Sequence, residues 1–404
     1  MLLSNKLTYF IWWLGFFIGF PLFITPSLSI FRGGQGDMSF SLPVGLLFIA
    51  TYYAAGITNI IKNGLSNSIY LLYLLWVLSA IIIAYPALVV SDASLLAIYL
   101  IPSLLSFSFA WSIGRNEDIN SILRQLGIGF VTSVTTGAFL HLASSFATYG
   151  VIGAFAVRGE FSIFGLFSIY QKFIYYSTTL SIASFLALIY FDGWKMWFAW
   201  SILVMDILLC GAREAILLAM IYLLSSSYIR TGIGGVVKIL FRLFLVLFFL
   251  ITFFAFNGME IGIDDLVFFK KIVAIGDSSS GSDVTAGRAE AINEVWSMFD
   301  ITPLFVFFGS RFDTIHSFLG TPHNQYVEWF LRGGIIFTLG NIFFSFLAIK
   351  NYLMRGGDYL KYGILLTWLM LISNNINTPF RAPYTSIFAW VLIGFGIRLS
   401  TFTK

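Results

Sequence analysis

The stretch TPHNQYVEWFLRGGIIFTLGNIFFSFLAI, residues 321–349, contains the change of character that decides the predicted fold. Its first residues belong to Gly258–Arg332, a long run whose many charged side chains make it too polar to lie inside a lipid bilayer. From Gln325 onward the chain turns apolar and stays so for the roughly 20 residues that a membrane-spanning helix needs. We therefore expect hydrophobic helices that hold a large polar loop at one membrane face, and we look for function in that loop.

The composition indicates that the whole chain is a membrane protein. Of its 404 residues, 58% are hydrophobic and 10% are charged, whereas globular domains have about 25% charged residues. The net charge of +4 is small and scattered, which argues against nucleic acid as a partner. A single cysteine excludes an internal disulfide, and no CxxC or histidine-rich motif suggests a metal. Lys6 precedes a long apolar run without a small-residue cleavage site, so we expect an uncleaved first span.

We expect an all-α, polytopic membrane protein of about twelve transmembrane helices, because that many apolar stretches approach the length of a span. The stretches are 7–30, 43–61, 70–90, 94–113, 125–147, 172–191, 196–210, 214–229, 239–257, 325–349, 362–378 and 384–400. The chain then forms one integral membrane domain, with helices 1–9 in residues 1–257 and helices 10–12 in 325–404. Residues 258–324 between them form the large loop, with short amphipathic helices.

The distribution of basic residues predicts the orientation in the membrane. An even number of spans places both termini on the same side. If that side is the cytoplasm, more than half of the 23 Lys and Arg residues lie on inner segments, as the positive-inside rule requires. Most acidic residues then lie outside. We expect cytoplasmic termini and a periplasmic loop.

Several arginines nevertheless fall on the outer side, where arginine near hydrocarbon is costly unless it is paired. They include Arg158, Arg213, Arg288, Arg311, Arg332 and Arg381. Under one interpretation each pairs with a nearby acid, as Arg332 would with Glu328 one helical turn earlier, or Arg213 with Glu214. Under the other, the arginines share one face in order to bind an anion. The sequence leaves both interpretations open.

Two predicted helix starts suggest where an anion would bind. Thr321 and Pro322 are typical of an N-cap and a first helical turn, which would place His323 and Asn324 in that turn. Arg213 similarly lies in the first turn of the eighth span. Free N–H groups and the helix dipole make such first turns favourable for anions.

Arg288 is predicted to approach the same face from the loop. It opens an amphipathic stretch that should end before Pro303 and lie along the membrane interface. The apolar residues that recur there at helical spacing are Ile292, Val295, Trp296 and Phe299. Guanidinium groups bind diphosphate oxygens bidentately, and the neighbouring apolar spans suit a long lipid tail. The ligand that this pattern implies is a lipid diphosphate.

The remaining polar candidates each have two interpretations. His323 either orients or deprotonates an acceptor hydroxyl, or it only caps a helix, whereas His141 and His316 are expected to be structural or exposed. Asp206 lies in the middle of a span, where a carboxylate is a functional hypothesis unless it is protonated or pairs with a neighbouring helix. Three asparagines near the outer end of the eleventh span either bind sugar hydroxyls or satisfy backbone at the helix end: Asn374, Asn375 and Asn377.

Taken together, these motifs resemble the loop signature of the bacterial O-antigen polymerase and O-antigen ligase superfamily. The matching motifs are Gly287-Arg288-Ala289-Glu290-Ala291 to Trp296, Pro303-Leu304, Phe308-Gly309, Pro322-His323-Asn324-Gln325-Tyr326 and Gly333-Gly334-Ile335. Gly211-Ala212-Arg213 matches the superfamily's arginine at the foot of a mid-chain span. One departure is Phe308-Gly309-Ser310-Arg311, which replaces the more usual glycine-x-glycine.

The resemblance implies a metal-independent, membrane-embedded glycosyltransferase of the GT-C type in the bacterial inner membrane, without a cofactor. Its donor would be an undecaprenyl-diphosphate-linked glycan, with the active site on the periplasmic face. Arg213 and Arg288 would hold the donor diphosphate, and His323 would act at the acceptor hydroxyl with Asn324 beside it. The further substrate-binding candidates are Tyr326, Arg158, Arg311, Arg332 and Arg381.

The acceptor distinguishes the two activities within the superfamily. A polymerase transfers the glycan to another lipid-linked repeat unit, and a ligase transfers it to lipid A-core. The Phe- and Ile-rich composition and the compact loop favour the polymerase, for which a chain-length regulator protein is a further candidate partner. A transporter of the same glycan is the alternative from another class. It should have polar residues along several spans and related halves, neither of which the sequence contains.

Overall fold

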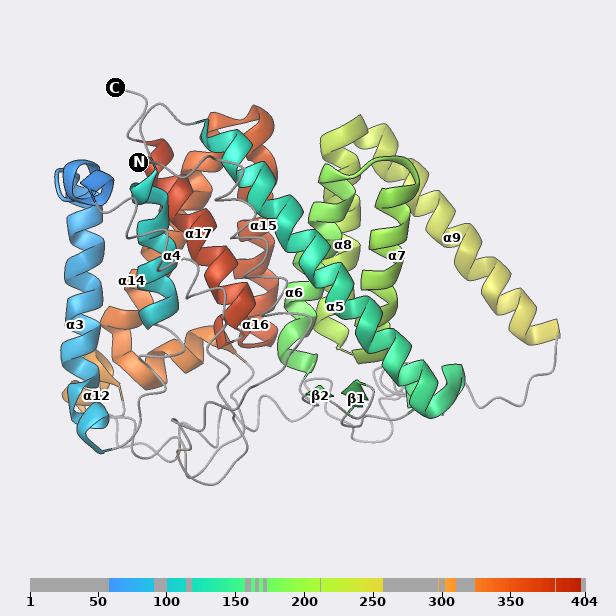
Figure 1. Ribbon diagram of the computed structural model, residues 1–404, viewed down its shortest axis with the longest axis horizontal. Coiled ribbons are helices and arrows are strands. Elements are labelled where there is room, and N and C mark those ends of the chain that lie inside the picture. The colour runs from blue at the N-terminus through green and yellow to red at the C-terminus, as the bar shows by residue number, and fades with distance from the viewer. Residues whose placement is uncertain are drawn as a thin grey trace.

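The computed structural model describes residues 58–90, 100–113, 118–156, 161–163, 167–169, 173–210, 212–256, 297, 302–309, 324–381 and 383–400. These residues are almost entirely helical, as an all-α fold requires (Figure 1). The exception is a short antiparallel pair, β1 (Phe161–Ile163) and β2 (Phe167–Ile169), in which Ser162 is opposite Ser168. The sequence analysis did not predict this hairpin.

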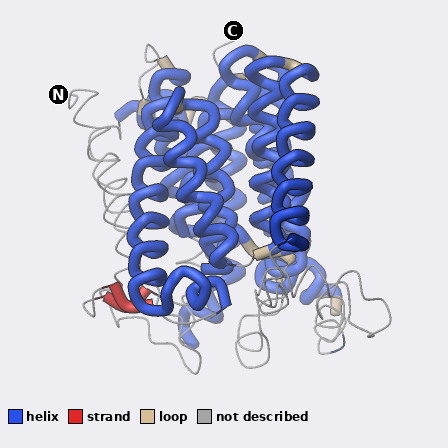
Figure 2. The backbone as a smooth tube through the Cα atoms, turned by 90° about the vertical axis from the view of Figure 1, so that its right-hand side faces the viewer, coloured by secondary structure: helices blue, strands red, loops and turns tan. Residues whose placement is uncertain are grey.

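The helix bounds follow many of the expected spans closely. The α-helices are α3 (Ser68–Val90), α4 (Ile101–Ser112), α5 (Ile119–Ala156), α6 (Phe173–Tyr190), α7 (Gly193–Cys210), α8 (Arg213–Thr231), α9 (Ile233–Phe256), α12 (Pro303–Phe308), α14 (Gln325–Arg355), α15 (Leu360–Trp368), α16 (Asn374–Ile376) and α17 (Pro383–Leu399). Short π or 3-10 turns are η2 (Ile60–Gly64), η6 (Gly357–Tyr359), η7 (Leu369–Ser373) and η8 (Pro379–Arg381). The longer helices run side by side, with β1 and β2 at one end of the bundle (Figure 2).

Within the described residues, three helices are long and apolar enough to cross a membrane. They are Ile119–Gly150 of α5, together with α7 and α14. Shorter apolar helices occupy Ser68–Ile82, Ser177–Tyr190 and Thr385–Leu399. The membrane character of the chain therefore has structural support, whereas the number of twelve spans stays a prediction.

The eleventh span, expected to be one helix over 362–378, is a continuous helical run from Leu360 to Ile376 that contains a π turn. The α-helix α15 passes into the π turn η7 and the short α16, after which Asn377 is extended (φ −146°, ψ −175°). Asparagine side chains compete with the helical backbone for hydrogen bonds, and the residue before a proline, here Thr378 before Pro379, is driven away from helical geometry. The chain therefore turns into η8 inside the bundle.

The start of α14 also differs from the prediction. Its N-cap is Asn324, whose extended backbone (φ −145°, ψ 118°) cannot continue a helix, so Thr321 is not the N-cap. The Asn324 side-chain oxygen accepts hydrogen bonds from the N–H groups of Tyr326 (3.0 Å) and Val327 (3.1 Å). Asparagine is at least as good an N-cap as threonine, and this one leads directly into the apolar run.

Helix α12 packs against a kink in α14. At the kink, Gly334 has a φ of 66°, and a Cβ atom added there would collide with the backbone of Phe307 and Phe308. At the end of α12, Gly309 has a φ of 74°, and a Cβ there would lie 2.6 Å from the carbonyl oxygen of Leu331. Two of the motifs quoted above, Phe308-Gly309 and Gly333-Gly334-Ile335, therefore form one close backbone contact.

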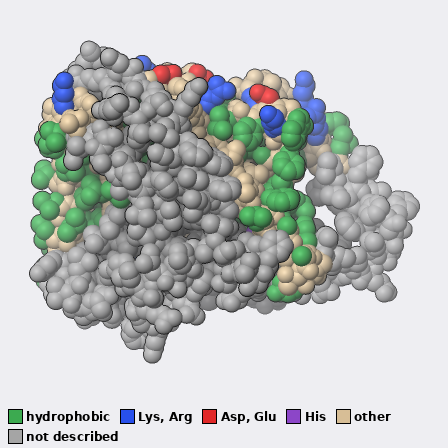
Figure 3. Space-filling view, viewed as in Figure 1, with side chains coloured by type: hydrophobic (Ala, Val, Ile, Leu, Met, Phe, Trp, Pro, Cys, Tyr) green, Lys and Arg blue, Asp and Glu red, His purple; other side chains and the backbone are tan. Residues whose placement is uncertain are grey.

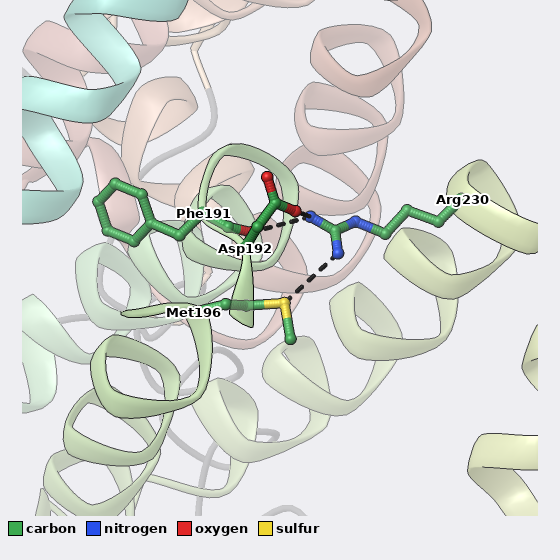
Figure 4. A network of polar contacts seen from close by, with 4 residues as sticks. All are labelled: Phe191, Asp192, Met196 and Arg230. Carbon is green, nitrogen blue, oxygen red and sulfur yellow. Dashed lines mark hydrogen bonds and ion pairs between the residues drawn. The ribbon is translucent and has the colours of Figure 1, made fainter. Parts of the chain in front are cut away.

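Lys and Arg side chains lie along one end of the bundle, above sides that are largely apolar (Figure 3). There, Arg230 at the end of α8 donates to the carbonyl oxygen of Phe191 (2.9 Å), to Asp192 Oδ1 (3.2 Å) and to Met196 Sδ (3.4 Å) (Figure 4). Arg398 at the end of α17 donates to carbonyl oxygens at the end of α4. The contacts of Arg230 bring the C-terminal ends of α6 and α8 next to the start of α7, as an up-and-down arrangement of helices requires.

Candidate functional site at the starts of α8 and α14

Helix α8 begins at Arg213, as the sequence predicted. Its N-cap, Ala212, has an extended backbone (φ −87°, ψ 105°) and no side chain that could satisfy the first N–H groups. Glu214, which follows Arg213, is only 3% exposed although it carries a carboxylate. The first turn of α8 therefore lies inside the bundle, and its polar groups need partners from other elements.

Those partners come from three parts of the chain. The hydroxyl of Thr178, on α6, donates to Glu214 Oε1 (2.9 Å). The hydroxyl of Ser373, in η7, donates to the same oxygen, and Asn377 Nδ2 donates to Oε2 (3.3 Å). Glu214 thus connects α8 to α6 and to both the π turn and the C-cap of the eleventh helix. The sequence analysis considered Glu214 only as a partner for Arg213; a carboxylate at the start of an apolar span was the signal that could have identified it.

The start of α14 also contacts the eleventh helix. Asn324 Nδ2 donates to the carbonyl oxygen of Asn375 (3.2 Å), and the Tyr326 hydroxyl donates to that of Met370 (2.7 Å). Gln325 Oε1 accepts a hydrogen bond from the N–H of Phe380 (3.0 Å). The first turn of α14 is therefore bound before and after the extended residue that ends α16.

The starts of α8 and α14 thus lie on one segment, Ser373–Asn377. Glu214 contacts this segment from α8, and Asn324 contacts it from α14. Each helix start carries a partial positive charge from its backbone dipoles. The start of α8 that the sequence predicted, and the start of α14 at a later N-cap than predicted, therefore contact the same five-residue segment.

Three buried polar atoms close to this segment have no hydrogen-bond partner within the described part of the chain. They are Gln325 Nε2, Asn374 Oδ1 and Thr378 Oγ1. Most buried polar atoms in folded proteins are hydrogen-bonded, so such atoms mark a region suited to polar ligands. Chemically they offer one donor, one acceptor and one hydroxyl, which are the groups that bind sugar hydroxyls.

Two of the three asparagines nevertheless satisfy backbone groups, as one of their two interpretations required. Asn375 Nδ2 donates to the carbonyl oxygen of Leu371 (2.8 Å). Asn377 Oδ1 accepts a hydrogen bond from the N–H of Thr378 (2.9 Å). Asn375 bonds to the preceding helical turn, and Asn377 supports the extended backbone that follows the helix. A role in binding sugar stays a prediction.

The ion pair predicted from the spacing of Arg332 and Glu328 is present. Arg332 Nε lies 2.5 Å from Glu328 Oε1, and the two residues are 2% and 1% exposed. This arrangement is the simpler of the two interpretations of Arg332. A role for Arg332 in binding substrate stays a prediction. One of its guanidinium nitrogens is already bound to Glu328.

Asp206 pairs with a neighbouring helix, which was one of its predicted alternatives. Its Oδ1 lies 2.5 Å from Nδ1 of His141, which places a buried ionisable pair between α7 and α5. Asp206 Oδ2 has no hydrogen-bond partner among the described residues. Asp206 is one helical turn from Cys210, the last residue of α7, and α8 begins three residues after Cys210.

The other predicted site residues lie outside the described residues in whole or in part. Arg158, Arg288, Arg311 and His323 are outside them, and so are the side chains of Arg213 and Arg381. Among the site candidates, the structure therefore places the backbone of Arg213 and the side chain of Asn324 at Ser373–Asn377, with Tyr326 bonded to Met370 just before that segment. Within the described residues, no group of three or more His, Cys, Asp or Glu side chains is arranged to hold a metal ion.

No protein-family model and no curated protein sequence matches the chain. The class that the structure defines is a helical bundle in which α5, α7 and α14 have the length and composition of membrane spans.

Proposed function

We propose that the chain is an inner-membrane glycosyltransferase that polymerises undecaprenyl-diphosphate-linked O-antigen repeat units at the periplasmic face. The observation that carries this proposal is the meeting of two helix starts at Ser373–Asn377. One start contains Arg213 in its first turn. The other is capped by Asn324, which directly follows His323 in the sequence.

The proposed reaction needs no metal. An acceptor hydroxyl attacks the anomeric carbon of the donor glycan from the side opposite the lipid diphosphate, and the configuration at that carbon inverts. The bond from the carbon to the diphosphate oxygen breaks, and its electron pair stays on the leaving diphosphate. Arg213 and Arg288 bind the negative charge that grows there, and His323 takes the proton of the hydroxyl.

The carboxylate of Glu214 is compatible with an anion site beside it. A carboxylate next to a diphosphate repels it unless other groups bind the carboxylate's charge. Both oxygens of Glu214 accept hydrogen bonds from side chains elsewhere in the bundle. The N–H groups at the start of α8 are therefore not required to bind their own acidic residue.

The experiment that tests the proposal uses the purified protein with lipid-linked repeat units, with and without lipid A-core. A ladder of products without lipid A-core supports a polymerase. Transfer that requires lipid A-core indicates a ligase. No transfer under either condition contradicts the proposal and favours a transporter.

Three substitutions test the assigned residues. Arg213→Ala, Arg288→Ala and His323→Ala are each expected to abolish product while protein levels stay normal, and normal ladders from all three would reject the assignment. Arg230→Ala is a matched control, because Arg230 belongs to the same helix as Arg213 but forms its contacts at the opposite end (Figure 4). We expect it to keep the normal ladder.

A further inference from the structure

We infer that Glu214 is a positioning residue, which fixes the first turn of α8 and the backbone of Arg213 against the segment Ser373–Asn377. The inference rests on the proposed function, because its measurable consequence is how tightly the donor diphosphate binds. Glu214 itself has no assigned contact with the substrate. Its effect is transmitted through the residue that precedes it.

The first turn of α8 depends on Glu214 for its attachment. The N-cap residue Ala212 forms no side-chain cap. Glu214, by contrast, accepts hydrogen bonds from Thr178, Ser373 and Asn377, which belong to separate elements. Because consecutive Cα atoms are about 3.8 Å apart, a displacement of Glu214 moves the backbone of Arg213 with it.

A carboxylate fits this place better than an amide. The described partners of Glu214 all donate: two hydroxyls point to Oε1 and the Asn377 amide points to Oε2. A glutamine can present its oxygen to the two hydroxyls, but its NH₂ group then faces the NH₂ group of Asn377. Glu214→Gln therefore breaks one specific contact while it keeps the shape of the side chain.

The same geometry predicts that a second substitution restores the contact. Asn377→Asp places an acceptor opposite the new amide, so that the hydrogen bond forms with its direction reversed. One carboxylate oxygen still accepts from the N–H of Thr378, as Asn377 Oδ1 does. The carboxylate and the amide have then exchanged places between α8 and the end of the eleventh helix.

The chain also offers a control contact at the same end of the bundle. The hydroxyl oxygens of Thr179 and Thr385 are 2.6 Å apart and connect α6 to α17. Both residues are buried, as Thr178 is. Thr179→Val therefore removes a buried polar contact without touching α8, whereas Thr178→Val removes a donor to Glu214 with the same change of shape.

The experiment measures initial rates of the purified full chain in lipid nanodiscs against the concentration of lipid-linked repeat unit. Glu214→Gln is expected to raise the donor KM roughly tenfold and to lower kcat as well, because the displaced Arg213 binds the diphosphate both before its bond breaks and while the negative charge grows on it. Thr178→Val should raise it in the same direction. Adding Asn377→Asp to Glu214→Gln should return the donor KM to within about threefold of wild type. Thr179→Val should leave it unchanged.

Melting temperatures of the same proteins separate positioning from stability. A merely structural role predicts lower melting temperatures for Glu214→Gln and Thr179→Val alike, with an unchanged donor KM. That result would overturn the inference, as would a failure of Asn377→Asp to rescue Glu214→Gln. If wild type is active and Arg213→Ala is not, the proposed function survives either failure. An inactive wild type rejects the proposed function instead.

Discussion

The buried pair of His141 and Asp206 shows what one contact between two spans contributes. The cost of burying two ionisable groups in a low-dielectric interior is offset when the two groups pair with each other. Removing one leaves a polar group without its partner. Replacing both by apolar side chains of similar size avoids that penalty.

Asp206→Leu alone is therefore expected to lower the free energy of unfolding by about 3 kcal/mol. The double substitution His141→Phe with Asp206→Leu should recover most of this loss. Unfolding in detergent, followed by circular dichroism, measures both. Equal losses in the single and double variants would contradict this account.

An exposed ion pair provides the control for that measurement. Asp192 pairs with Arg230 at 3.2 Å, but its side chain is 91% exposed. Exposed pairs contribute little because water screens both charges. We expect Asp192→Asn to leave the unfolding transition unchanged.

At the scale of elements, the contact between α12 and α14 depends on glycine for two separate reasons. Gly334 has a positive φ, and α12 occupies the place where its side chain would lie. Gly356, at the other end of α14, has nearly the same φ of 63°, but nothing lies within 4 Å of an added Cβ. A substitution at Gly356 therefore measures the cost of the positive φ alone, whereas one at Gly334 measures that cost plus the collision with α12.

Gly356→Ala is expected to cost about 1–2 kcal/mol, from the positive φ alone. Gly334→Ala should cost clearly more, because α12 must also move away. Melting curves of the two variants measure the difference, and limited proteolysis near α12 reports its release. Equal costs for both substitutions would mean that α12 does not pack at this kink.

The sequence predicted the helix starts better than the partners that surround them. Arg213 opens α8 as expected, and the N-cap of α14 is Asn324, three residues after the predicted N-cap Thr321. The signals for a helix start come from residues that are close together in the sequence. Glu214 and Ser373 are 159 residues apart, and no periodicity in the chain indicates that they meet. Long-range pairing of this kind appears only once the helices are packed.

The π turn in the eleventh helix could not be predicted from hydrophobicity. Residues 362–378 are apolar enough for one continuous regular span. The helix ends where Asn377 becomes extended and accepts a hydrogen bond from the N–H of Thr378, directly before Pro379. The asparagines were noted in the sequence, but their effect on the backbone was left open.

At the scale of the whole molecule, basic residues at one end of the bundle predict its orientation. The positive-inside rule assigns that end to the cytoplasm and the starts of α8 and α14 to the periplasm. Two exposed positions report on this directly. Lys238 lies near the start of α9, and Thr302 precedes α12 within the predicted loop.

Labelling with a membrane-impermeant maleimide on spheroplasts tests the orientation. The background is Cys210→Ser, which removes the chain's single cysteine. Thr302→Cys is expected to react from outside, and Lys238→Cys should react only after the membrane is opened. The reverse pattern would place the proposed site on the cytoplasmic face and contradict the proposed orientation.

The π turn η7 amounts to one additional residue wound into a helix. Deleting a single residue there, such as Leu371, would restore a regular α-helix, which advances about 100° for each residue. Everything after the deletion would rotate by that angle, so Asn377 would face away from Glu214 with its chemistry unaltered. The length of the π turn therefore determines which residues at the end of the eleventh helix face Glu214, in addition to the hydrogen bond that Ser373 of the turn donates.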